Sequence, residues 1–453
     1  MKLRFIGVAL ALSIPYSAAA QPVAPSPAPA PSVPLTLEAA LTQALATHPR
    51  LEVAWSGIAA AQARKRGAKA EGLPQAGVTV TGTAQGPARS FPGGGSLTPG
   101  RQLEAGADLS VTLYTGGRVK AGKKGAASAE GAALARLDSE AQRLVLDVTE
   151  AFLDTLDAQR QIDLAVDLTR LNQERLRIGR VRLAAGVGAP FEVTEAEADL
   201  AESIQREIDA RARVRQSGAA LNTLLGQPAE TPLQLTELSG TEPLPVNDTA
   251  VPGGLDAAQA RELAKDRPDL RALREDVHTA EAGVDSARAA RRPFVSLGGN
   301  LLRRIPETLL GGFAWSLGSS LVQSIFDGGR TRAQVEAARA ERNRTGAVLA
   351  SAERDVETEV EQARVGLEAA EKRLGAEEQR IKAATEALAV ARQRVEAGIS
   401  AGVEAVVAET VLTRARTSAE TARFQVYRAR VRLTYLIGQA YPQTLQLRQA
   451  KAN

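Results

Sequence analysis

Cysteine is absent from this 453-residue sequence, and histidine occurs only twice, as His48 and His278. Without cysteine the chain can form no disulfide and can carry no lipid on a cysteine. The two histidines lie in unrelated helical contexts, and no Ser/His/Asp arrangement or cluster of metal ligands stands out. We therefore expect no enzyme, no catalytic residue, no metal site and no cofactor.

Aromatic residues make up only 3% of the chain, and the formal net charge is +4. This charge is too small to argue for a nucleic-acid ligand, so we expect none.

A long apolar run occurs only at the start. The first 20 residues combine the basic Lys2 and Arg4, an apolar stretch and Ala18-x-Ala20, which predicts a secretory signal peptide at 1–20. The Pro- and Ala-rich segment 21–34 is expected to be disordered. No run of about 20 apolar residues follows, so we expect no transmembrane helix. An exported chain of this kind is periplasmic, extracellular or a membrane β-barrel.

The rest of the sequence contains two copies of one pattern. An offset of 212 residues aligns YTGGR, from Tyr114, with FDGGR, from Phe326, and upstream an offset of 219 aligns Pro74 with Pro293. We expect the seven extra residues of the first copy in the Gly/Pro-rich segment 89–100. The repeats are predicted at 35–226 and 255–438, with a Pro-rich connector at 227–254 and a tail at 439–453.

Each copy predicts a helix that ends near a proline, Thr36 to Glu71 and Leu255 to Arg291. Alternating apolar and polar residues follow in 77–83 and 107–115, and again in 294–302 and 312–326. This period of two predicts strands whose two faces meet different surroundings. The strand pattern alone fits two alternatives, namely a soluble hairpin packed on one side and a sheet in a membrane.

The period then changes to that of a coiled coil. Val360, Leu367 and Leu374 begin a series of apolar residues spaced by seven that runs to Val395, and no proline occurs between Arg330 and Gly398. Such spacing predicts a left-handed supercoil, and these residues would span about 100 Å. Short Gly-containing turns and return helices of roughly half that length are expected next, ending at Gly226 and Gly438.

Gly117, Gly122 and Lys123 reproduce the GxxxxGK of a phosphate-binding loop, but Lys124 stands where that loop needs Ser or Thr. The second Gly-Gly, in FDGGR, lacks the GK altogether. We therefore interpret each Gly-Gly as the flexible point where a strand becomes a long helix. Lys120, Lys123 and Lys124 are then expected to form a solvated or headgroup-facing stripe.

The signal peptide, the duplicated helix–hairpin–helix pattern, the Gly-Gly-Arg junctions and the R-x-x-x-x-G tips resemble the TolC-like outer-membrane efflux proteins along nearly the whole mature chain. The resemblance implies a mixed, mainly α fold, with long coiled-coil helical hairpins and four membrane strands per protomer. Three protomers would form one 12-stranded β-barrel that continues as a periplasmic α-helical barrel. Four strands alone cannot close a barrel, and an open edge is not viable in lipid.

The resemblance also implies a location and partners. The protein would be a passive conduit in the outer membrane of a Gram-negative bacterium, extending into the periplasm. Its partners would be two further copies in a homotrimer, a periplasmic adaptor (membrane fusion) protein, an inner-membrane pump of the RND or ABC type, and outer-membrane lipid.

Site residues follow from the same resemblance. The strand–helix junctions would be Pro74, Gly116, Gly117 and Arg118, and Pro293, Gly328, Gly329 and Arg330. The adaptor-docking tips would be Arg182, Leu183, Gly186 and Val187, and Arg394, Val395, Gly398 and Ile399. The acidic positions that narrow the pore of family members correspond to Glu404 and Val407, so only one of them is acidic here. Glu404 can equally be a helix N-terminal acid facing the dipole.

Multidrug or other small-molecule efflux is the favoured function. Type I protein secretion and heavy-metal efflux use the same kind of outer component and stay as alternatives. A periplasmic coiled-coil adaptor is the alternative from another class, although two hairpins and membrane-length strands argue against it.

Overall fold

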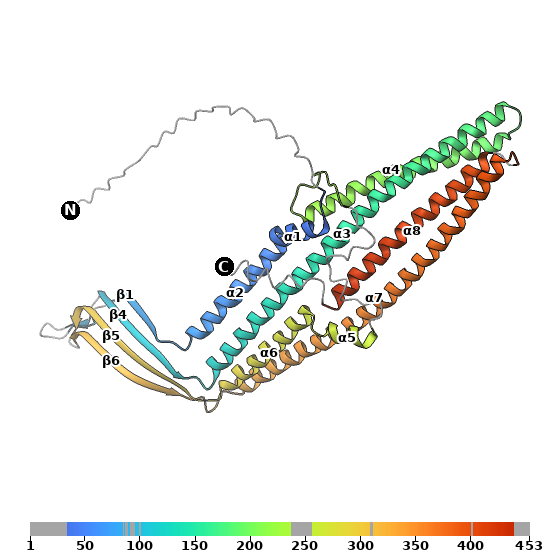
Figure 1. Cartoon of the computed structure of the whole chain (residues 1–453). Coiled ribbons are helices and arrows are strands. Elements are labelled where there is room, and N and C mark those ends of the chain that lie inside the picture. The colour runs from blue at the N-terminus through green and yellow to red at the C-terminus, as the bar shows by residue number, and fades with distance from the viewer. Residues whose placement is uncertain are drawn as a thin grey trace, which may run out of the picture.

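The structure, a computed structural model, describes residues 34–84, 86, 89–90, 96–98, 101–236, 256–308, 311–399 and 402–438. The expected signal peptide, nearly all of the lead-in, most of the connector and the tail lie outside these residues. A curved sheet occupies one end of the molecule, and long helices run from it to two tips at the other end (Figure 1).

The helices repeat with the same lengths in both copies. α3 (Arg118–Ala184) and α7 (Arg330–Glu396) have 67 residues each, and α4 (Pro190–Leu224) and α8 (Gly402–Leu436) have 35 each. A 67-residue helix is about 100 Å long. The expected long outgoing helices and half-length return helices are therefore present.

The helix expected before each hairpin is in fact two helices, so that expectation was wrong. The first copy has α1 (Leu37–Thr47) and α2 (Pro49–Ala70), and the second has α5 (Ala257–Ala264) and α6 (Pro268–Ala289). The break falls at His48 and Arg267, whose ψ angles are 128° and 139°. A proline disfavours helical geometry in the residue before it and suits the first position of a new helix.

The four main strands form one antiparallel sheet in the order β1-β4-β5-β6. They are β1 (Gln75–Ala84), β4 (Arg101–Tyr114), β5 (Phe294–Thr308) and β6 (Gly311–Val322). β4 and β5 pair across the two copies. A short ribbon of β2 (Arg89–Ser90) and β3 (Ser96–Thr98) lies in the segment where the extra residues of the first copy were expected.

β6 ends at Val322, four residues before the expected Phe326. Its counterpart β4 continues to Tyr114, which corresponds to Phe326 and pairs with Val295 of β5. Among the described strands β6 pairs only with β5, and Val322 lies opposite Phe294, the first residue of β5. β6 therefore ends where its pairing with β5 ends.

α3 runs through the middle of the helical layer. It packs against α2 and α6 near the sheet and against α4 and α8 further away, whereas α7 packs against α6 and α8. The largest core joins α1, α2 and α3 with the ends of α4 and α8, and includes Leu41, Leu144, Phe152 and Leu221. Val360 and Leu388 of the predicted coiled-coil series are buried on α7, which confirms its apolar face.

The two copies also meet where strands become helices. Gly116 has a φ of +65°, and a Cβ there would lie 2.6 Å from Cβ of Arg292 and 2.7 Å from the carbonyl oxygen of Ala289. Nη1 of Arg292 donates to the carbonyl oxygen of Gly116 at 3.0 Å. Glycine is therefore needed here both for its conformation and for the close approach.

We predict that Gly116→Asn destabilises the protein by about 1–3 kcal/mol more than Gly117→Asn, which is the cost typical of overpacking. Asparagine tolerates a left-handed backbone, and Gly117 also has a positive φ, but a Cβ there meets only a guanidinium nitrogen at 3.4 Å. The apparent melting temperature from circular dichroism at 222 nm measures the difference. Equal melting temperatures for the two variants would show that the contact with α6 is unimportant.

Candidate functional site

The sheet has one apolar and one polar face. Strand pairing places Val78, Ala107, Leu301 and Trp315 in one row across the four strands. The next row consists of Gly77, Asp108, Asn300 and Ser316. Since neighbouring rows point to opposite sides of a sheet, the expected alternation is confirmed.

The apolar face is uncovered. Val78 is 81% exposed, Trp315 72% and Leu317 70%. A soluble hairpin would bury this face against the protein, but the sheet makes no sizeable contact with any helix among the described residues. The soluble-hairpin alternative is therefore wrong, because the apolar face needs an apolar environment from outside the chain.

The polar face carries its own interactions across strands. Nε of Arg304 donates to Oε1 of Glu104 at 2.6 Å and thereby joins the two copies. The Ser316 hydroxyl donates to Oδ1 of Asn300 at 3.1 Å. A face of hydroxyl, amide and charged groups is suited to water.

The predicted junction residues lie where strands and helices meet. Pro74 and Pro293 directly precede β1 and β5, and Arg118 and Arg330 begin α3 and α7. Gly116, Gly117, Gly328 and Gly329 all have positive φ angles, between 64° and 100°.

Asp327 caps the second junction. Its carboxylate accepts hydrogen bonds from the hydroxyl and the backbone N–H of Thr331 and from the N–H of Gly329, the last two at 2.9 and 3.0 Å. These bonds, chiefly that from the Thr331 hydroxyl, hold the pKa of Asp327 below its ordinary value. The first copy has Thr115 here, whose Oγ1 accepts from the N–H of Val119 at 3.2 Å.

Both tips close with the same backbone geometry. The φ angles of Gly186 and Gly398 are +75° and +70°. The N–H of Val187 donates to the carbonyl oxygen of Arg182 at 3.0 Å, and that of Ile399 to Arg394 at 2.9 Å. This is the Schellman ending of a helix, which favours glycine.

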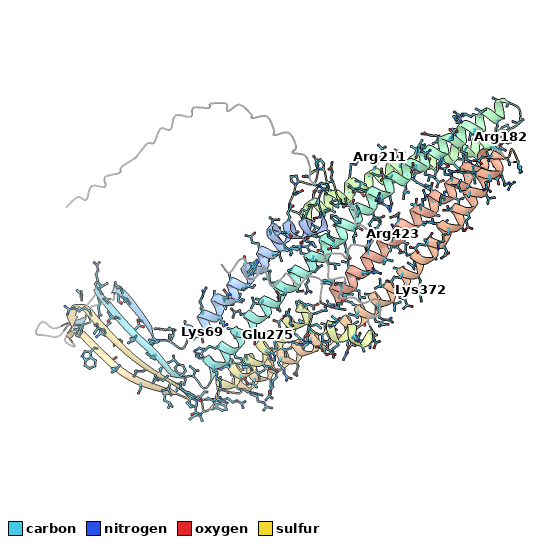
Figure 2. All side chains as sticks on the ribbon, in the orientation of Figure 1. Lys69, Arg182, Arg211, Glu275, Lys372 and Arg423 are labelled. Carbon is cyan, nitrogen blue, oxygen red and sulfur yellow. The ribbon has the colours of Figure 1, made fainter. Side chains whose placement is uncertain are left out.

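The tips expose apolar side chains at the end of the molecule furthest from the sheet. Val187 is 70% exposed and Ile399 71% exposed. Leu183 is partly exposed and Val395 half-buried. Figure 2 shows Arg182 at the tips and Lys69 at the sheet end. The expected tip residues thus share one end of the molecule.

Glu404 lies in the first turn of α8, and Val407 follows on the same helix with 42% of its surface exposed. Nη1 of Arg394, at the end of α7, lies 3.1 Å from Oε1 of Glu404. Sequence reasoning considered the pore and the helix dipole for Glu404 but missed this ion pair. The only available signal was that residues 394 and 404 flank one short turn.

Two further features concern the described residues only. None of their helices is both long and apolar enough to cross a membrane. Within the same part of the chain, no three His, Cys, Asp or Glu side chains come together as a metal-binding group.

Comparison with known proteins gives concordant results. The family model for outer membrane efflux proteins matches residues 40–227 and 260–439. Nodulation protein T of Rhizobium leguminosarum bv. viciae is 26% identical over 396 residues, covering 84% of this chain and 78% of that protein. Outer membrane protein OprJ of Pseudomonas aeruginosa is 29% identical, covering 76% of this chain and 71% of OprJ.

The same fold occurs in a solved structure. The CmeC outer membrane channel of Campylobacter jejuni superposes with a TM-score of 0.78 at 16% identity, covering 91% of this chain and 88% of CmeC. The expected fold class, mainly α with duplicated helical hairpins and a four-stranded sheet, is therefore confirmed. Since the family match spans both repeats, this chain belongs to the outer membrane efflux protein family and is an efflux channel component of a Gram-negative outer membrane.

Proposed function

We propose that three copies of this chain assemble into one closed channel. This channel would be a passive conduit for small molecules, which it receives from an inner-membrane pump through a periplasmic adaptor. The observation that carries the proposal is that the chain is open along both of its long sides.

The open sides are continuous from sheet to helices. β1 and β6 are the edge strands; α2 leads into β1, and β6 leads into α7. α3 and α7 have equal lengths, yet α3 contains 23 buried residues and α7 only 8. This difference places α7 on an open side, next to the open edge of β6.

Two different open sides favour a ring. If β6 of one copy pairs with β1 of the next, the association is head-to-tail, and it leaves no free edge once the ring closes. In lipid the ring has to close, because unpaired backbone N–H and C=O groups are costly there. Three copies supply the twelve strands that the family resemblance implies.

The duplication indicates how neighbouring copies meet. Within the chain, Gly116 of the first repeat packs on Ala289 and Arg292 of the second. The aligned positions are Gly328, Ala70 and Leu73. Among the residues that the structure describes, none lies within 4 Å of a Cβ added at Gly328, and Leu73 is 59% exposed. We propose that Gly328 packs on Ala70 and Leu73 of the next copy.

Gly328→Asn should therefore reduce the amount of trimer, whereas Gly329→Asn should not. Both positions have positive φ, so the backbone strain is similar, but only position 328 would face a backbone carbonyl of the neighbour. Heat-dependent gel shift of membrane fractions measures the trimer. Equal trimer yields from the two variants would contradict the proposed contact.

The tips are the proposed adaptor-docking surface. Support comes from their exposed apolar residues, from their matched geometry in both copies, and from their place about 100 Å along α3 and α7 from the sheet. An adaptor that contacts both tips would therefore meet the same backbone geometry twice in each copy.

The double variant Gly186→Val, Gly398→Val should lose export and crosslinking to the adaptor while keeping its trimer. A left-handed backbone costs a residue with a Cβ about 1–2 kcal/mol, and a β-branched side chain is the least tolerant, so the turns would rearrange. The double asparagine variant is the control, because asparagine tolerates this conformation. The docking assignment fails if the valine variant exports and crosslinks as the wild type does.

Glu404 is the proposed pore aperture, with Val407 one turn further along. Three-fold symmetry would bring three carboxylates near the axis, where they would attract cations. Arg394 lies within ion-pair distance of Glu404 in each copy and would offset part of this charge. Removing Glu404 and removing Arg394 should therefore have opposite effects on the charge near the axis.

We expect Glu404→Ala to lower cation selectivity and block by multivalent cations, and Arg394→Gln to raise both. Reversal potentials and block in planar bilayers measure these effects, at expression levels matched to the wild type. If neither variant changes selectivity, Glu404 faces away from the pore and acts only at the start of α8.

A further inference from the structure

A basic cavity of about 450 Å³ lies at the sheet end of the helical layer. Its charged lining comes from three helices: Lys124 of α3, Glu281, Asp285 and Arg288 of α6, and Arg339 and Arg342 of α7. Lys124 is six residues into α3 and Arg339 nine residues into α7, which corresponds to about 9 and 14 Å of helix.

The positive charges of this cavity exceed its negative ones and are poorly paired. Arg288 and Asp285 approach to 3.6 Å, and Arg342 and Glu281 only to 4.0 Å. Lys124 and Arg339 have no carboxylate oxygen within 4.0 Å among the described residues. Four cations around one cavity repel one another, and the two acids offset only half of their charge.

The duplicated scaffold does not require these residues. The first-copy positions aligned with Arg339 and Arg342 are Ala127 and Glu130, and the second-copy position aligned with Lys124 is Glu336. Both copies build the same helices at the same lengths with these different residues. The basic cavity is therefore specific to one place in the chain rather than a by-product of the repeat.

We infer that this cavity binds a phosphate group carrying two or more negative charges. The guanidinium groups of Arg339 and Arg342 can each offer two N–H donors to phosphate oxygens, and Lys124 offers a point charge. The phosphate could belong to a soluble anion or to an acidic phospholipid headgroup. All lining residues lie in one chain, so the inference does not depend on the trimer or the adaptor.

Titration of the purified full-length protein in lipid-free detergent with inorganic pyrophosphate, followed by calorimetry, tests the inference. The variant Arg339→Ala, Arg342→Glu carries the first-copy residues and should bind at least about tenfold more weakly. Lys372→Ala is the control: Lys372 is an exposed cation of the same helix, 33 residues further on (Figure 2), and its loss should leave binding unchanged.

Nanodiscs then distinguish the source of the phosphate. If headgroups occupy the cavity, pyrophosphate binding persists in phosphatidylcholine discs and is lost in phosphatidic acid discs, whose terminal phosphate can carry two negative charges. If the cavity serves soluble anions, binding persists in both. The inference is overturned if the wild type does not bind pyrophosphate in detergent, or if the double variant, shown by circular dichroism at 222 nm to be folded, binds as tightly as the wild type.

Discussion

Backbone hydrogen bonding in lipid is the constraint on which this structure depends. The sheet presents an apolar face, with Trp315 and Leu317 largely exposed, yet β1 and β6 each have an edge that no other described strand pairs with. Such edges are costly where no water can reach them. The single chain is thus an incomplete unit, and its shape makes sense only as a segment of a closed wall.

The helical layer, like the sheet, has an open side. α3 is flanked on both sides and is rich in buried residues, whereas α7, of equal length, is open on one side. Gly116 already packs closely on the second repeat inside the chain. A contact that one chain makes between its own halves is a template for the contact between chains, because the halves share their junctions and their helix lengths.

Much of this architecture was predictable from the sequence because it rests on spacing. The constant offset of 212 residues predicted the equal helices, and the alternation in 107–115 and 312–326 predicted the sheet faces. Local backbone chemistry was partly missed: Pro49 and Pro268 break the first helix of each copy. The early end of β6 depends on where its pairing with β5 stops, which the alternation within one segment does not encode.

Some features of the candidate sites were also predictable from the sequence, and others were not. The tip and junction glycines were found because a left-handed backbone leaves a clear signal in sequence. The pairing of Arg394 with Glu404 and the meeting of Lys124 with Arg339 and Arg342 depend on which helices lie side by side. No local pattern encodes those contacts, so only the folded arrangement reveals them.

The equal helix lengths set the distance of each hairpin tip from the sheet. Outgoing helices of 67 residues and return helices of 35 place both tips the same number of turns below the sheet. Losing one residue from α3 alone would rotate its tip by about 100° relative to that of α7. A change in tunnel length therefore requires matched insertions or deletions of about seven residues in every helix of the wall. Such changes keep the two tips level with each other and preserve their relative orientation.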